Sequence, residues 1–195
     1  MSKLVAEVVH TNKVETDAGA RANFRQVGNT YDYNGVSTPT EVLDTFPTWC
    51  NRIEIKFSNL LSFSNTQVTW FTFGNSSGRI NPFNSTAGSV QSSWQALTVV
   101  DGISNINICT VYGLGSTVYN SGSMFADRIY PSENIWRCYG NGMYRVGTLT
   151  GQSGTWATET EQTDLSASNP TTFGITRQVG QFPIYGKWTT YYHEY

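Results

Sequence analysis

The sequence predicts an all-β fold, an antiparallel β-sandwich of jelly-roll type, from three observations. Charged residues make up 13% of the chain, about half their usual share in globular domains, and residues that favour strands and tight turns replace them. Short apolar runs are separated by turn signals such as 74–78 and 151–154. A helix-like stretch at 41–49 is short and is interrupted by Thr45 and Pro47. This pattern is typical of a sandwich or jelly roll, not of alternating strands and helices.

The alternation of apolar and polar residues predicts the individual strands. Residues 52–57 alternate with period two, as in a strand that lays one face on a core. Residues 66–73 carry apolar side chains on both faces, which predicts a central strand or one that faces a neighbouring subunit. Further strands are predicted at 90–100, 108–118, 123–130, 134–139, 143–149, 172–178 and 187–195.

A tight turn is predicted within 139–144. The pair Asn141-Gly142 can take the positive φ values that a two-residue hairpin turn needs. The strands on either side of it are therefore expected to form a β-hairpin.

The chain is long enough for one domain with a buried core. After a strand-like run at 4–9, the first part of the sequence is polar and irregular. Residues 1–48 are therefore predicted to be an N-terminal arm or attachment segment, and residues 49–195 a sandwich domain. The alternative, that residues 1–48 contribute strands to the same sandwich, stays open.

The charge distribution argues against two classes of partner. The net charge is −2 and the lysines and arginines do not cluster, so no nucleic-acid binding is expected. The N-terminal residues contain no long apolar run, so neither a signal peptide nor membrane insertion is expected.

The three cysteines, Cys50, Cys109 and Cys138, are too far apart in sequence for a CxxC redox pair or a zinc knuckle. An odd number leaves at least one unpaired within a monomer. They are expected to be small buried hydrophobic residues, which suggests assembly in a reducing cytoplasm. No cofactor or metal site is predicted.

Nothing in the sequence predicts an enzyme, and no catalytic residue is assigned. The two histidines, His10 and His193, lie near the chain ends, and no nucleophile-elbow, zinc-protease, phosphate-loop or calcium-loop motif occurs. The remaining enzymatic option is a small glycosidase with paired carboxylates. Glu159 and Glu161 are its candidates, although both are expected to lie in a solvated loop.

Aromatic residues make up 14% of the chain. They supply core mass, subunit interfaces or stacking platforms for sugars. The tryptophans inside predicted strands are assigned to a core or an interface, and these are Trp70, Trp94, Trp136 and Trp188.

Three other aromatic residues lie close to Gly-rich turns and are the candidates for exposed ligand contacts. They are Tyr139, Tyr144 and Trp156. Even for these three residues, packing against the turns is favoured over contact with a ligand.

The order of strand motifs from Arg52 to the C-terminus resembles a known group of proteins, the jelly-roll domains of tailed-phage virion proteins such as tail fibres and head fibres. The motifs that carry this resemblance are Ile53–Leu60, Val68–Gly78, Gly122-Ser123-Met124, Asn134-Ile135-Trp136, Phe173-Gly174-Ile175-Thr176 and the closing Tyr192-His193-Glu194-Tyr195.

The resemblance implies a virion structural protein of the fibre, adaptor or capsid-decoration kind. Such a protein would be a homo-oligomer, with a trimer favoured, and its partner would be another virion protein or a bacterial surface glycan. It would be made in the host cytoplasm, released by lysis and located in the virion. The competing hypotheses are a free carbohydrate-binding β-sandwich module and, third, the small glycosidase.

Overall fold

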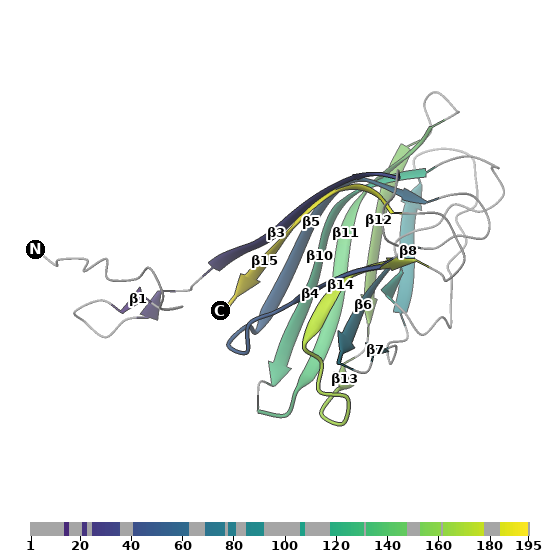
Figure 1. The fold of residues 1–195 in the computed structure, drawn as a ribbon. Helices are drawn as coiled ribbons and strands as arrows, with labels where there is room; N and C mark the ends of the chain where they lie inside the picture. The colour runs from purple at the N-terminus through teal and green to yellow at the C-terminus, as the bar shows by residue number, and fades with distance from the viewer. Residues whose placement is uncertain are drawn as a thin grey trace, which may run out of the picture.

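The structure, a computed structural model, describes residues 14–15, 21–22, 25–35, 41–62, 69–76, 78–80, 85–91, 106–107, 118–130, 132–147, 153–160, 162–177 and 184–194. In this part of the chain every regular element is a strand, and two antiparallel sheets pack against each other (Figure 1). The predicted all-β sandwich is confirmed. The described residues contain no helix with the length and apolar character needed to span a membrane.

The larger sheet has eight strands and forms the curved layer behind the shorter strands in Figure 1. Its order is β3 (Arg25–Asn34), β15 (Tyr185–His193), β5 (Arg52–Ser62), β10 (Val118–Tyr130), β11 (Ile135–Val146), β12 (Ser153–Thr160) and β8 (Ser85–Gln91), with the short β13 (Thr163–Asp164) also paired to β11.

The smaller sheet covers one face of the larger sheet. Its order is β4 (Glu41–Thr45), β14 (Thr172–Arg177), β6 (Thr69–Asn75) and β7 (Gly78–Ile80), and β9 (Ile106–Asn107) pairs with β6. A separate ladder joins β1 (Val14–Glu15) to β2 (Arg21–Ala22).

Several predicted strands coincide with strands of the structure. The prediction at 52–57 falls within β5, and that at 123–130 within β10. The predictions at 172–178 and 187–195 match β14 and β15 over the described residues. Most of 90–100 and 108–118 lies outside the described residues.

The predicted central strand at 66–73 is confirmed for the residues that the structure describes. β6 begins at Thr69 and lies between β14 and β7. The side chains of Phe71 and Phe73 on one face are fully buried, and Thr72 on the other face is buried too.

The predicted hairpin turn at 139–144 is wrong, because β11 runs through these residues without a break. The glycines here make room for packing instead of turning the chain. A Cβ added at Gly142 would lie 2.1 Å from the Ser121 carbonyl oxygen and 2.8 Å from Cζ2 of Trp156, and one at Gly140 would lie 2.1 Å from Sδ of Met124. Both glycines alternate with buried residues on the core side of β11.

Of the described strands within the first 48 residues, β3 and β4 belong to the sandwich. β3 lies at one edge of the larger sheet, and β4 lies at the edge of the smaller sheet. For residues 25–34 and 41–45, the structure therefore shows strands of the sandwich, and the boundary placed at residue 48 falls close behind them. Residues 1–13 lie outside the described part of the chain.

The core between the sheets is mainly aromatic. The ring of Phe73 lies 4.6 Å from that of Phe173 and 4.9 Å from that of Trp136, measured between centroids. Trp136 and Trp188 are buried, as predicted. Nothing is described of the Trp70 side chain, and Trp94 lies outside the described residues.

Two of the three cysteines can be placed. Cys50 and Cys138 are buried and free, so the prediction of buried cysteines is confirmed for both. Burial raises the pKa of the Cys50 thiol to about 12 and also raises that of Cys138, so both stay protonated near neutral pH. Cys109 lies outside the described residues.

A buried carboxylate ties the two sheets together at one edge. Asp44 in β4 of the smaller sheet accepts hydrogen bonds from the hydroxyl of Tyr31, from Nδ2 of Asn29 at 2.9 Å and from Oγ1 of Thr190 at 3.3 Å. These donors lie on β3 and β15 of the larger sheet. A buried carboxylate without hydrogen-bond donors would cost considerable free energy. The need to keep Asp44 within reach of these three donors therefore fixes the position of β4 on the larger sheet.

Replacing Gly142 with Ala should destabilise the protein by about 1–3 kcal/mol, because the added methyl group has no room against backbone and indole atoms. Urea unfolding measures the change. The matched control is Asn141→Ala, at the exposed neighbouring position, which should change stability by less than about 0.5 kcal/mol. Equal stabilities for the two variants would contradict this account of Gly142.

The contact with Asp44 also makes stability depend on alkaline pH. Burial, then the hydrogen bond to Asp44, raises the pKa of Tyr31 from 10.0 to about 12. The unfolded chain therefore loses this proton at lower pH than the folded protein, and stability should fall as the pH rises from about 10 to about 12. Burial also raises the pKa of Tyr192, which adds to the same slope.

Urea unfolding between pH 9 and 12 tests this dependence. Tyr31→Phe should reduce the slope, and Tyr130→Phe, which removes a hydroxyl from an exposed tyrosine, should leave the wild-type slope. An unchanged slope in Tyr31→Phe would show that this hydroxyl is not the titrating group.

Candidate functional site

The expected exposure of Tyr144 and Trp156 is wrong, because their side chains are only 5% and 2% exposed. The glycines near them lie within strands, and the absence of a side chain at each leaves space for an aromatic ring on the core face. The Tyr144 ring lies where a Cβ on Gly154 would be, with its nearest atom 2.6 Å away, and the Trp156 indole stacks on Phe57 at 5.9 Å. Both residues are part of the core and are not available to a ligand.

Tyr139 lies on the outer face of the larger sheet, the face that points away from the smaller sheet. Its ring stacks on Phe125 at a centroid distance of 5.1 Å, and its hydroxyl donates to Oδ2 of Asp127 at 3.1 Å. Burial and the negative charge of Asp127 raise the pKa of Tyr139. Of the three predicted ligand contacts, Tyr139 is the one placed on a surface.

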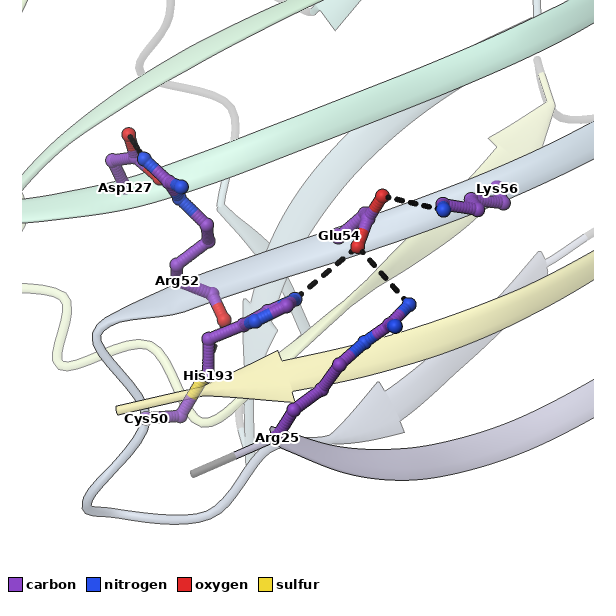
Figure 2. Close-up of polar contacts among 7 residues, drawn as sticks. All are labelled: Arg25, Cys50, Arg52, Glu54, Lys56, Asp127 and His193. Carbon is purple, nitrogen blue, oxygen red and sulfur yellow. Dashed lines mark hydrogen bonds and ion pairs between the residues drawn. The ribbon is translucent and has the colours of Figure 1, made fainter. Parts of the chain in front are cut away.

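Two groups of ion pairs lie on the outer face near the C-terminal end of β15 (Figure 2). Arg52 donates from Nε and Nη2 to the two carboxylate oxygens of Asp127 at 2.7 and 2.9 Å. This two-pronged pair joins β5 to β10, and Tyr139 extends it to β11.

The second group surrounds Glu54 with cationic or ionisable nitrogens (Figure 2). Its carboxylate lies 3.5 Å from Nη2 of Arg25, 3.3 Å from Nζ of Lys56 and 3.2 Å from Nε2 of His193. The guanidinium of Arg25 also lies over the Tyr191 ring, 3.9 Å from its centroid. The side chain of Glu54 is only 10% exposed, so this network joins β3, β15 and β5 on the outer face.

This arrangement suits cohesion of the sheet better than catalysis. The Glu54 carboxylate is occupied by its contacts with three nitrogens from β3, β5 and β15. Burial lowers the pKa of His193, and the hydrogen bond and charge of Glu54 act in the opposite direction. His193 is therefore a partly buried partner of Glu54.

Of the other catalytic candidates, only Glu159 lies among the described residues. Glu159 lies on β12, not in a loop, and its exposed carboxylate pairs with Nη2 of Arg137 at 2.8 Å. Glu161 and His10 lie outside the described residues. Within the described ranges, no group of three or more His, Cys, Asp or Glu side chains could hold a metal ion.

A distortion of the larger sheet creates a different candidate site. In β5, Ser58 and Asn59 lie opposite the single residue Ser121 of β10, because the register shifts between Asn120 and Gly122. This is a β-bulge, a feature that re-aims side chains. Asn59 takes a left-handed φ of 53°, and its backbone N–H donates to Oγ of Ser121 at 3.1 Å.

A pocket of about 610 Å³ lies beside the bulge, at the end of the larger sheet where β3 finishes and β15 begins. This bulge pocket is lined by Asp32, Tyr33, Ser58, Asn59, Leu61, Tyr119, Tyr185, Gly186 and Lys187. Figure 1 shows the strands that form it, with the C-terminus at the opposite end of β15. Its volume falls within the range typical of small-molecule sites.

Two of the three pocket tyrosines are held in place by close neighbours. The Tyr33 ring lies 5.5 Å from the indole of Trp188. The Tyr185 ring occupies the space above Gly35, where a Cβ would lie 1.8 Å from Cζ of the tyrosine. The pocket walls are therefore set by packing and do not depend on a ligand.

The bulge pocket is a site that sequence patterns do not predict. Its residues come from four strands, and the shift in register that joins them depends on pairing between residues far apart in the chain. The one local signal is Asn59, because asparagine tolerates a positive φ better than most residues. It stands in the short polar run that follows the first alternating strand.

The titration of His193 tests the Glu54 network. In a His10→Gln background, the remaining histidine should titrate below pH 6.5, and Glu54→Gln should lower its pKa further because the opposing contribution is lost. NMR chemical shifts of the imidazole measure both values. Glu133→Gln, which neutralises an exposed acid, is the control, and a higher pKa in Glu54→Gln would contradict the described contact.

Because the folded-state pKa of His193 is lowered, this residue contributes stability above pH 6.5 that is lost as the pH falls through the folded value.

No family model, curated protein or solved structure matches the chain. Its own fold and side chains are therefore the basis for assigning a function.

Proposed function

We propose that the protein is a non-enzymatic structural component of a phage particle, of the fibre, adaptor or capsid-decoration kind, and that it acts in assembly. Support comes from the order in which the strands pair, together with the composition of the outer face. The virion location and the jelly-roll class are parts of this proposal.

The strands of the two sheets pair in a nested order. Among the described ladders of the sandwich, β3 pairs with β15, β4 with β14, β5 with β10 and β6 with β7. Among these eight strands the first pairs with the last, the second with the seventh, and so on inward, while β11, β12, β8 and β13 extend the larger sheet beyond β10. A long antiparallel ribbon folded over itself has this pairing, and such double-sheet jelly rolls are common in viral capsid and lectin domains.

The single observation that carries the assembly role is the exposure of two apolar side chains on the outer face, which also carries the ion pairs described above. Met143 on β11 is 65% exposed and Val27 on β3 is 61% exposed. Both lie on the face opposite the core, since Met143 precedes the buried Tyr144 and Val27 pairs with Tyr191, which lies between two buried residues. The stacked pair of Phe125 and Tyr139 lies on the same face.

A second copy of the chain is the occupant that this face fits best. Exposed Met and aromatic side chains are enriched at protein interfaces. The ion pairs of Glu54 and Asp127 are satisfied within the sheet, so covering them does not leave a buried charge unpaired. A closed homo-oligomer, with a trimer favoured, would cover the apolar residues of each copy.

The mass in solution, measured by light scattering, tests this proposal. The wild-type protein should form a trimer, and Met143→Asp and Val27→Asp should shift the mass towards the monomer because each places a charge in the interface. Ala167→Asp, at an exposed position outside the sheets, is the matched control and should keep the wild-type mass.

A wild-type monomer would contradict the assembly role and would favour the free carbohydrate-binding module. A trimer that both aspartate variants leave intact would place the interface elsewhere and contradict the role of the outer face.

A further inference from the structure

We propose that the bulge pocket binds a short, neutral carbohydrate. This inference goes beyond the assembly role, and the described residues of a single chain are enough to form the pocket.

Two residues beside the pocket have positive backbone φ angles. Asn59 takes its left-handed conformation at the bulge, and Gly186 across the ladder has a φ of 125°, which side chains rarely adopt. A Cβ on Gly186 would lie 2.9 Å from Cα of Leu60. Two unusual backbone positions thus meet on neighbouring strands, and the Asn59 side chain is exposed beside them.

The pocket walls suit a ligand with apolar faces and a polar rim. Tyr33, Tyr119 and Tyr185 each present an amphipathic ring with a polar hydroxyl. Pyranose rings have the matching character, because their C–H faces pack on aromatic rings and their hydroxyl groups point outward. Among the described lining residues, Leu61 is the aliphatic one, and it is largely buried. The pocket therefore offers little aliphatic surface for a purely apolar ligand such as a lipid chain.

The polar groups of the pocket favour a neutral ligand over an anionic one. Nζ of Lys187 and Oδ2 of Asp32 lie 3.5 Å apart, so the charges on the lining largely cancel. The nearby guanidinium of Arg145 lies over the Tyr119 ring, 5.2 Å from its centroid. The amide of Asn59 and the hydroxyl of Ser58 can both donate and accept hydrogen bonds, as recognition of sugar hydroxyl groups requires.

The size of the pocket limits the ligand. About 610 Å³ of open space accommodates a short oligosaccharide, and the exposed rim formed by Asp32, Asn59 and Lys187 lets a longer glycan continue outside. The walls are already in place, since Tyr33 packs beside Trp188 and Tyr185 packs over Gly35. A preformed site loses less conformational entropy on binding.

Isothermal titration calorimetry with purified protein and defined neutral di- to tetrasaccharides, in gluco, galacto, manno and N-acetylhexosamine series, tests this site. At least one sugar should bind, and Tyr119→Ala and Asn59→Gly should each weaken its affinity at least tenfold. Asn59→Gly is chosen because glycine keeps the left-handed backbone and removes only the amide. Tyr130→Ala, at an exposed tyrosine outside the pocket, is the control and should bind as the wild type does.

Absence of binding across the panel would overturn the proposal, as would binding that Asn59→Gly and Tyr119→Ala leave unchanged. The light-scattering mass is a separate measurement, so failure of this site leaves the assembly role intact and failure of the assembly role leaves this site intact.

Discussion

The structure depends on packing large aromatic side chains between two sheets, and glycines opposite them make this packing possible. Trp156 projects towards Gly142, and the Tyr144 ring lies over Gly154. With any side chain at those two glycines, the rings would have no place in the core and the sheets would have to separate. Close-packed interiors tolerate such expansion poorly. Glycines on the core face of the larger sheet thus leave the space that its bulky aromatic residues occupy.

The same glycines explain where prediction from the sequence succeeded and where it failed. Residues 52–57 are identifiable as a strand because their alternation is local and directly reflects a core on one side. Asn141-Gly142 resembles a turn because glycine has the same local signature in a hairpin and in a packed strand. Only the partner across the sheet distinguishes the two, and that partner is not visible in the local sequence.

The candidate sites show the same division. Tyr139 could be identified as a surface aromatic residue, but its neighbours Phe125 and Asp127 are brought to it by strand register. The bulge pocket was not predicted because the two-against-one pairing at Ser58 and Asn59 follows from long-range contacts. The two polar sites lie at opposite ends of the same strands. At one end, ion pairs hold neighbouring strands together, and at the other a local distortion opens space between them.

The pairing of the first strand of the sandwich with the last has a consequence for how the chain folds. β15 lies between β3 and β5 and completes the ladders of both, yet it follows both of them by more than a hundred residues in the sequence. Until it pairs with them, β3 and β5 each present an unpaired edge, the kind of surface on which strands of other molecules aggregate. Closure of the larger sheet thus joins strands that are far apart in the sequence, and folds with such long-range contacts form slowly. A chain interrupted before β15 lacks the strand that lies between β3 and β5.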